Sequence, residues 1–169
     1  DWVRVGVYDV GQPRGSRAFA YRGGDLLVAT DVGMVALSSA LQKDAVTVAL
    51  NALSAPIENE WRLAAQRRPG DWQVEVWSSG QMLAISLPTG SQQTPTWFVA
   101  NARTNRWASF TGWDASCLEV FQSRLFYGSP DGRVYEANTG GSDDGETYTG
   151  TYVPVFDQLG AVGVKTIHM

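Results

Sequence analysis

The sequence predicts a mainly β protein built from short antiparallel sheets, with one helical insertion. Short aromatic and β-branched runs recur along the chain, and polar or glycine-containing turns close them. Such runs are typical of antiparallel strands, because turns at this spacing leave no room for long helices. Residues 40–68 instead carry apolar side chains at helical spacing and are the expected insertion.

We predict that the stretch from Trp97 to Ala137 is the structural unit around which the rest of the chain is organised. It contains four short runs separated by turns, as in an up-and-down antiparallel sheet. Thr104-Asn105 is the expected first hairpin turn, because asparagine tolerates a left-handed conformation. Residues 129–132, Ser-Pro-Asp-Gly, suit a second turn, where proline and glycine fit the required backbone angles. We interpret this stretch as one propeller blade, and the fold class as a partial β-propeller-like array of antiparallel blades.

An earlier hairpin resembles the end of this stretch. Predicted strands at residues 1–10 and 17–21 precede a hairpin at residues 25–37, which is hinged near Gly33. Aligning Gly33 with Gly132 gives an ungapped offset of 132 − 33 = 99 residues. A repeated hairpin is expected of stacked or radially arranged β-units. The offset places Leu26 on Leu125, Leu27 on Phe126, Val28 on Tyr127, Thr30 on Ser129 and Val35 on Val134.

The helical insertion has a predicted start, face and end. Ser54 is the expected cap, Pro56 is tolerated in the first turn, and Pro69-Gly70 ends the helix. Glu58 and Arg62 are spaced for an i,i+4 ion pair. The expected apolar face consists of Ile57, Trp61, Ala64 and Ala65.

Further strands follow the insertion. Residues 72–77 alternate strictly and are expected to pair with residues 81–87 across a turn at 78–80. Residues 147–156 are the expected last strand of this region, and Pro154 within them indicates an edge or a bulge.

Composition is compatible with one packed domain. The chain has 169 residues, of which 44% are hydrophobic and 18% are charged, so a globular core is feasible. Thirteen basic and 17 acidic residues give a net charge of −4, so there is no electrostatic reason to expect binding to nucleic acid or an anionic membrane. The single cysteine, Cys117, excludes an internal disulfide and a thiolate zinc cage. We expect it to be a small buried side chain.

The ends of the sequence indicate a soluble piece of a longer protein. No run approaches the length of a membrane span, and the N-terminus lacks a leader of the signal type. The chain opens on Asp1 without a methionine, and residues 164–169 still alternate like a strand where the sequence stops. We therefore expect residues 1–169 to be one propeller-like domain of a longer polypeptide.

No set of residues predicts catalysis or metal binding. A nucleophile needs a neighbouring base, and the sole histidine, His168, lies at the C-terminus, so a catalytic triad is not expected. Asp143, Asp144 and Glu146 are candidate ligands for a calcium ion, which prefers clustered oxygens. Their spacing matches no known calcium-binding loop, so a solvent-exposed turn is the favoured interpretation. We expect no catalytic residues, no cofactor and no metal.

Two groups of residues leave glycan chemistry open as an alternative. Glycoside hydrolysis needs two converging carboxylates, but Glu75 and Glu119 alternate with apolar neighbours and are expected to face outward. The other candidate carboxylates are Asp114 and Glu136. Trp97, Trp107 and Trp113 are expected to be blade core or interface anchors, and a carbohydrate-stacking platform is the alternative.

The order of segments resembles a family of large structural proteins in tailed-phage virions. These proteins form the tail nozzle or the DNA-stabilising hub of short-tailed phages and are built on a β-propeller-like platform. The resemblance covers residues 24–150. The matching segments are residues 33–41 before the helix with Ile57 and Trp61, residues 97–101 with Thr104 and Trp107, residues 110–113, 120–121, 125–128, 131–132, 134–135 and 139–140.

The resemblance implies a non-enzymatic virion protein. It implies a homo-oligomeric ring in the phage tail that contacts neighbouring tail or connector proteins, without specific nucleic-acid binding and with a DNA channel wall as one possible location. The family's members are much longer than this chain, so a closed propeller is not implied. The alternative is a tail receptor module that binds or cleaves glycans. A third reading, a cellular kelch-like scaffold, rests on Asn101, Thr104 and Trp107.

Overall fold

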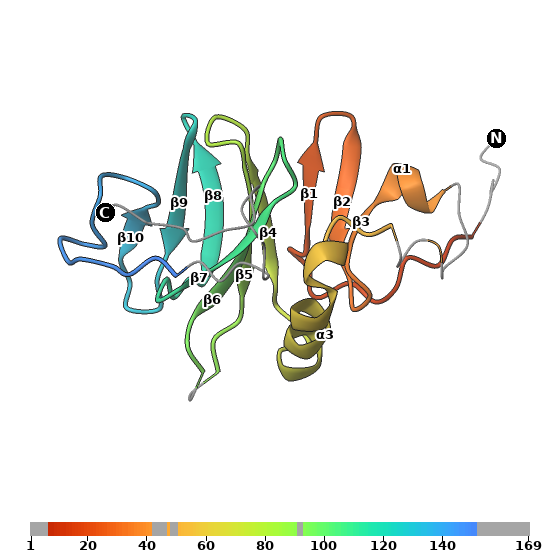
Figure 1. Ribbon diagram of the computed structural model, residues 1–169, viewed down its shortest axis with the longest axis horizontal. Coiled ribbons are helices and arrows are strands. Elements are labelled where there is room, and N and C mark those ends of the chain that lie inside the picture. The colour runs from red at the N-terminus through yellow and green to blue at the C-terminus, as the bar shows by residue number, and fades with distance from the viewer. Residues whose placement is uncertain (1–6, 42–46, 48–50, 91–92, 152–169) are drawn as a thin grey trace, which may run out of the picture. The chain divides into compact units, whose positions relative to one another are not determined.

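The computed structural model describes residues 7–41, 47, 51–90 and 93–151 (Figure 1). The chain divides into two compact units, Asp1–Asn138 and Thr139–Met169. The described residues form three antiparallel sheets with few helices. The prediction of a mainly β, antiparallel protein is therefore confirmed.

The first sheet contains the predicted early hairpin. Its strands are β1 (Phe19–Arg22), β2 (Asp25–Ala29) and β3 (Met34–Ala36), in that spatial order. Gly33 precedes β3 with a φ of +149°, a conformation that favours glycine. The hinge predicted at this residue is confirmed.

The middle sheet is a four-stranded meander, β4-β5-β6-β7. Its strands are β4 (Gln73–Trp77), β5 (Met82–Leu87), β6 (Thr96–Asn101) and β7 (Trp107–Thr111). The predicted pairing of residues 72–77 with 81–87 is confirmed. Asn105 has a φ of +52° between β6 and β7, which confirms the expected left-handed turn residue.

The third sheet consists of β8 (Cys117–Phe121), β9 (Arg124–Gly128) and β10 (Val134–Glu136). The prediction that residues 97–137 form one four-stranded blade is therefore wrong, since β6 and β7 belong to the middle sheet. The reason lies in β5, where every residue from Leu83 to Leu87 is buried. A buried central strand needs hydrogen bonds on both edges, and β6 pairs with the edge that β4 leaves open.

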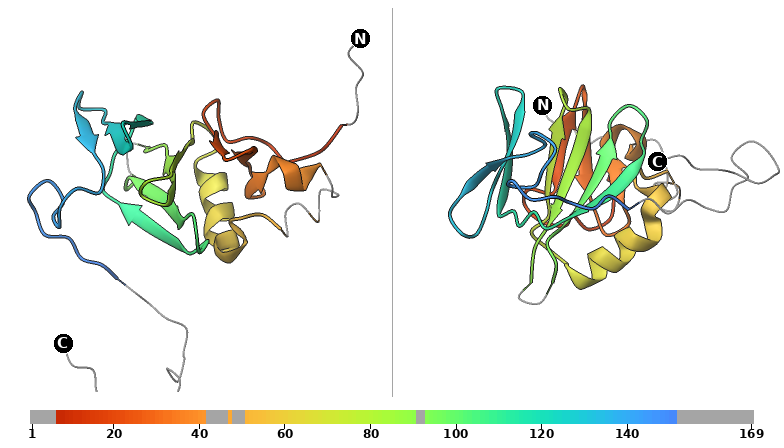
Figure 2. Two further views of the ribbon diagram at one scale, coloured as in Figure 1. Left: turned by 90° about the horizontal axis from the view of Figure 1, so that it is seen from above. Right: turned by 60° about the vertical axis from the view of Figure 1, so that its left-hand side comes forward.

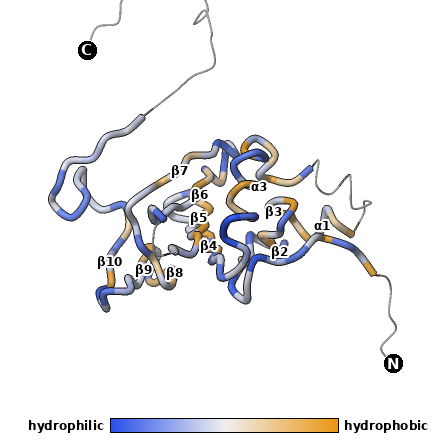
Figure 3. Tube along the Cα trace, turned by 90° about the horizontal axis from the view of Figure 1, so that it is seen from below, coloured by the Kyte–Doolittle hydropathy of each residue, from blue (hydrophilic) through white to orange (hydrophobic). Residues whose placement is uncertain are grey.

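Neighbouring sheets cover both faces of the middle sheet. Leu83, Ile85 and Leu87 point toward the first sheet, and Ala84 points toward the third. Hydrophobic residues gather along β5 and β6 (Figure 3). The first core cluster is Ala18, Ala20, Leu27, Ala29, Met34, Trp61, Ala65, Trp72, Val74, Leu83, Ile85, Leu87, Phe98 and Ala100. The second is Trp77, Ala84, Trp97, Val99, Leu118, Leu125, Tyr127 and Ala137.

The first strands of the three sheets lie side by side, with β4 between β1 and β8 (Figures 1 and 2). Arg17 and Gln73 form a parallel bridge, and the Val74 N–H donates to the Arg17 carbonyl at 3.0 Å. On the other side, the Gln73 side chain accepts from the Leu118 N–H at 3.1 Å and donates to the Ser116 carbonyl. Gln73 therefore connects the middle sheet to both neighbours.

The helix α1 (Leu37–Ala40) leads into the predicted insertion, which contains the 3-10 helix η1 (Ala55–Ile57) and α3 (Glu58–Arg67). Its predicted end and apolar face are confirmed, because Trp61 and Ala65 are buried in the first core cluster. Two other predictions are wrong. The Ser54 hydroxyl caps no helix but accepts the Met34 N–H at 2.9 Å. Instead of pairing with Glu58, Arg62 donates to Asn59 at 3.3 Å.

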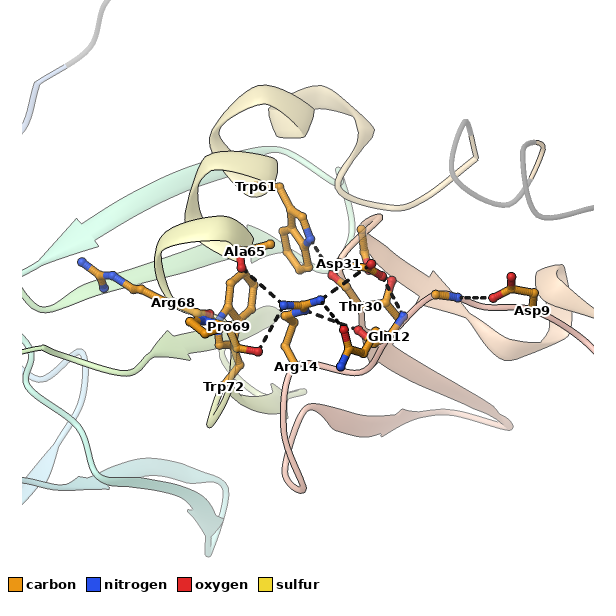
Figure 4. A network of polar contacts seen from close by, with 12 residues as sticks. Asp9, Gln12, Arg14, Thr30, Asp31, Trp61, Ala65, Arg68, Pro69 and Trp72 are labelled. Carbon is orange, nitrogen blue, oxygen red and sulfur yellow. Dashed lines mark hydrogen bonds and ion pairs between the residues drawn. The ribbon is translucent and has the colours of Figure 1, made fainter.

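Arg14 attaches α3 to the first sheet (Figure 4). Arg14 is only 6% exposed, and its guanidinium donates to the carbonyls of Ala65 at 3.3 Å and Pro69 at 3.1 Å. Asp31 lies 3.7 Å away as an ion-pair partner. A buried cation needs such partners to offset its lost hydration, so this contact fixes the end of the helix.

The predicted repeat has the wrong register. In β2, Leu27 and Ala29 are buried, but the offset of 99 places them on Phe126 and Gly128, which are only half-buried. A shift of one residue moves a strand's side chains to the opposite face. The two hairpins also differ in loop length, since the last ladder pair is Ala29–Met34 in one and Gly128–Val134 in the other.

Three further predictions need correction. Residues 7–10 form no strand, and the rest of the strand predicted at 1–10 lies outside the described residues. Residues 147–151 likewise form no strand, and 152–156 lie outside the described part of the chain. Cys117 is exposed rather than buried, because β8 alternates and points Leu118 and Val120 inward.

Candidate functional site

The three candidate tryptophans lie in two different core clusters. Trp97 and Trp113 belong to the cluster between the middle and third sheets. Trp107 packs against the cluster between the middle sheet and the first. The three rings therefore form no common platform.

Trp97 is fully buried on β6. Its indole N–H donates to the Trp113 carbonyl at 2.8 Å, and the two rings meet edge to face at 5.2 Å. Trp113, which is half-buried, stacks on Tyr127 at 5.6 Å. Tyr127 in turn stacks on Tyr135 at 5.2 Å. Edge-to-face and offset-stacked arrangements are the ones that aromatic rings prefer, so these ring contacts stabilise the packing of the middle sheet on the third.

Sequence reasoning did not single out Tyr127 and Tyr135 as neighbours of Trp113. A signal existed, since the turn predicted at residues 129–132 is confirmed, and the ladder that it closes places these two tyrosines opposite each other. The contact with Trp113 has no counterpart in the sequence, because it depends on the path of residues 112–116 between two sheets.

Trp107 lies at the start of β7 and anchors the insertion. Its indole N–H donates to the Leu53 carbonyl at 3.0 Å, and the Asn105 amide donates to the same oxygen at 3.0 Å. Its ring meets Trp61 edge to face at 6.2 Å. These contacts give Trp107 a structural role, because they hold the insertion against the middle sheet.

Two of the four candidate carboxylates approach each other where β4 passes β8. Burial raises the pKa of the Glu75 carboxyl, and the negative charge of Glu119 raises it further. The expectation that Glu75 faces outward is therefore only partly met, since this side chain is half-buried. Glu136 instead forms an ion pair with Arg124, and Asp114 lies between β7 and β8.

An open hollow of about 410 Å³ lies where β1, β4 and β8 begin. Its polar lining includes Arg17 and Asp71, of opposite charge, together with the exposed thiol of Cys117. Gln73 contributes to this lining, but both ends of its amide are already bonded to β8. The hollow is thus a junction between strands, and its charged groups could contact a polar partner. The lining residues are Ser16, Arg17, Asp71, Trp72, Gln73, Ser116 and Cys117.

The acidic stretch after the third sheet is a tight turn. Asp143 and Glu146 exchange backbone hydrogen bonds of 2.8 and 2.9 Å, and Asp144 and Gly145 have positive φ. Across residues 7–41, 47, 51–90 and 93–151, no three His, Cys, Asp or Glu side chains converge as metal ligands. His168 lies outside these residues.

Comparisons with known proteins return no relative. No family model matches the chain, and neither curated proteins nor solved structures give a significant match. In the described part of the chain, no helix has the length and apolar character needed to cross a membrane.

Proposed function

We propose that this chain is a non-enzymatic structural protein of a tailed-phage virion. In this proposal it belongs to the tail nozzle or hub and assembles with itself and with neighbouring tail or connector proteins. The observation that carries the proposal is that, among the described residues of the first unit, the outer faces of the first and third sheets each bear large exposed apolar side chains. Apolar side chains gathered on one face are typical of protein interfaces.

We further infer a partial β-propeller-like platform. Two features support it: consecutive antiparallel meanders pack face to face, and their first strands lie side by side. Propeller blades share both features. A partial array leaves edges and faces to be covered by other sheets, which is what a ring-forming subunit would use.

The test of this proposal is the composition of purified virions. We expect quantitative mass spectrometry of density-gradient-purified phage particles to find this chain, or a longer protein that contains it, in several copies per particle. Its gene should also lie beside portal, terminase or tail genes. Absence from intact particles that contain all other tail proteins would overturn the proposal.

A glycan-binding or glycan-cleaving tail module is the second candidate. The approach of Glu75 to Glu119 favours it, because a carboxyl with a raised pKa is suited to act as a general acid. If this candidate is correct, Trp113→Ala should lose retention of polysaccharide. Glu75→Gln should abolish depolymerisation but keep retention. Tyr148→Ala, which changes an exposed aromatic residue elsewhere, is the matched control.

A further inference from the structure

Among the described residues, β1 and β2 carry exposed apolar side chains on one face of the first sheet. Phe19 pairs with Val28, and Tyr21 with Leu26, on the face that points away from the middle sheet. Phe19 is 48% exposed and Tyr21 72%, and their partners are half-buried. Cover on this face begins only at Val35, which is buried against Val10 and Ala40. We call Phe19, Tyr21, Leu26 and Val28 the Tyr21 face.

Within the first unit, the third sheet also carries exposed apolar side chains on its outer face. Phe121 on β8 is 62% exposed and Val134 on β10 is 73% exposed. Between them, Phe126 is half-buried, with the Arg124 guanidinium 5.1 Å above its ring. The ladder places all of these side chains on the face opposite the core residues Leu125 and Tyr127. We call Phe121, Phe126 and Val134 the Phe121 face.

The sheets within the chain already stack in a way that would bring these two faces together. The middle sheet packs one face on the first sheet and on Trp61 and Ala65 of α3, and its other face on the third sheet, and in both contacts the first strands lie side by side. If this sheet-on-sheet packing continued beyond the third sheet, the next sheet would be the first sheet of another copy. The Phe121 face would then pack on the Tyr21 face of that copy.

We propose that copies of this chain associate head to tail, with the Phe121 face of one copy seated on the Tyr21 face of the next. The inference deepens the proposed self-assembly and rests on it. A contact between two different faces leaves one face of each kind uncovered, so the assembly adds copies until it closes into a ring or extends as a filament. The occupant of the Tyr21 face is thus a second copy of this chain.

Cross-linking of single-cysteine variants tests the orientation. Tyr21→Cys with Cys117→Ser and Phe121→Cys with Cys117→Ser each carry one thiol, so they can cross-link only between copies. We expect a short bismaleimide to give a heterodimer in the mixture, at least fivefold more than either variant gives alone. Homodimers at equal or greater yield, or no cross-linked product, would overturn the proposal.

Charge substitutions test the two faces separately. We expect Tyr21→Asp and Phe121→Asp each to weaken self-association at least tenfold in sedimentation equilibrium. Tyr148→Asp should leave it unchanged, because Tyr148 is 68% exposed and belongs to none of the three sheets. Circular dichroism must show that the variants remain folded. A wild-type chain that stays monomeric, or folded variants that associate like the wild type, would contradict the inference.

These outcomes separate this inference from the function on which it rests. If purified virions contain the protein but no head-to-tail cross-link forms, the virion role stands and the head-to-tail contact fails. If the cross-link forms and virions lack the protein, the contact stands and the virion role fails.

Discussion

At the residue scale, the surroundings of each tryptophan decide between a core and a surface role. Trp97 is fully buried and its N–H is bonded to Trp113, whereas Trp113 itself is half-buried. The sequence could not make this distinction, because Trp97 and Trp113 are both aromatic residues in or near strands. Trp97 is a member of the buried cluster between the middle and third sheets, whereas Trp113, on the connection between β7 and β8, packs against that cluster and stays partly exposed.

Trp97→Ala should be strongly destabilising. The substitution leaves a cavity between two sheets and removes the partner of the Trp113 carbonyl. We expect a loss of about 3–5 kcal/mol in the free energy of unfolding, measured by urea denaturation. For Tyr148→Ala, an exposed control, the change should stay within about 0.5 kcal/mol. Equal effects of the two substitutions would contradict the packing described for Trp97.

Glu75 should make stability depend on pH. Its folded-state pKa is raised above the ordinary value of 4.5, so the folded state holds a proton more tightly than the unfolded state does. The contribution of Glu75 to stability is then fully present below pH 4.5 and is lost as the pH rises through the folded-state pKa. We expect Glu75→Gln to be more stable than the wild type at pH 7 and similar to it at pH 4, by urea denaturation. A smaller gain should follow Glu119→Gln, and no gain in either variant at pH 7 would contradict the assignment.

At the element scale, local patterns predicted most strands, and long-range pairing decided the sheets. Alternation and turn residues are local, so they located the strands at 72–77, 81–87 and 97–101 to within a residue or two. Which strands share a sheet depends instead on buried edges. The assignment of residues 97–137 to one blade failed for that reason, since β5 required β6 as its second neighbour.

The turn before β3 provides a test of backbone geometry. A Cβ at Gly33 would lie 2.7 Å from the Ala52 Cβ and 2.8 Å from the Ser54 Oγ, at a φ of +149°. We expect Gly33→Ala to cost roughly 1–3 kcal/mol in thermal or urea denaturation, from strain and crowding. Gly24→Ala is the matched control, because no atom lies within 4 Å of its added Cβ. A Gly33 variant as stable as the Gly24 variant would show that the loop at residues 52–54 does not pack here.

At the scale of the whole molecule, the candidate site was only partly predictable. Glu75 and Glu119 were chosen as carboxylates in the sequence, but their approach results from β4 passing β8, a contact between strands about 40 residues apart. The hollow at the start of β1, β4 and β8 brings together Arg17, Asp71 and Cys117 from three separate segments. No local pattern marks such a junction.

Removal of the second unit should leave the first intact. Every residue from Thr139 to Thr151 is exposed, so this stretch contributes no buried side chain. We expect a chain that ends at Asn138 to unfold cooperatively, with a free energy of unfolding within about 1 kcal/mol of the full chain. Circular dichroism during urea denaturation measures this directly. A truncated chain that is unfolded in buffer would contradict the division into units.

The middle sheet also constrains how the protein is made. Both of its faces are apolar and buried, so as the nascent chain leaves the ribosome, β4 to β7 emerge with only the first sheet available to shield them. The face of the middle sheet that packs on the third sheet stays exposed to solvent until residues 117–136 have been translated. A ribosome that stalls after β7 has been translated, but before β8, would therefore carry a nascent chain with an exposed apolar surface. Chaperones bind intermediates of this kind.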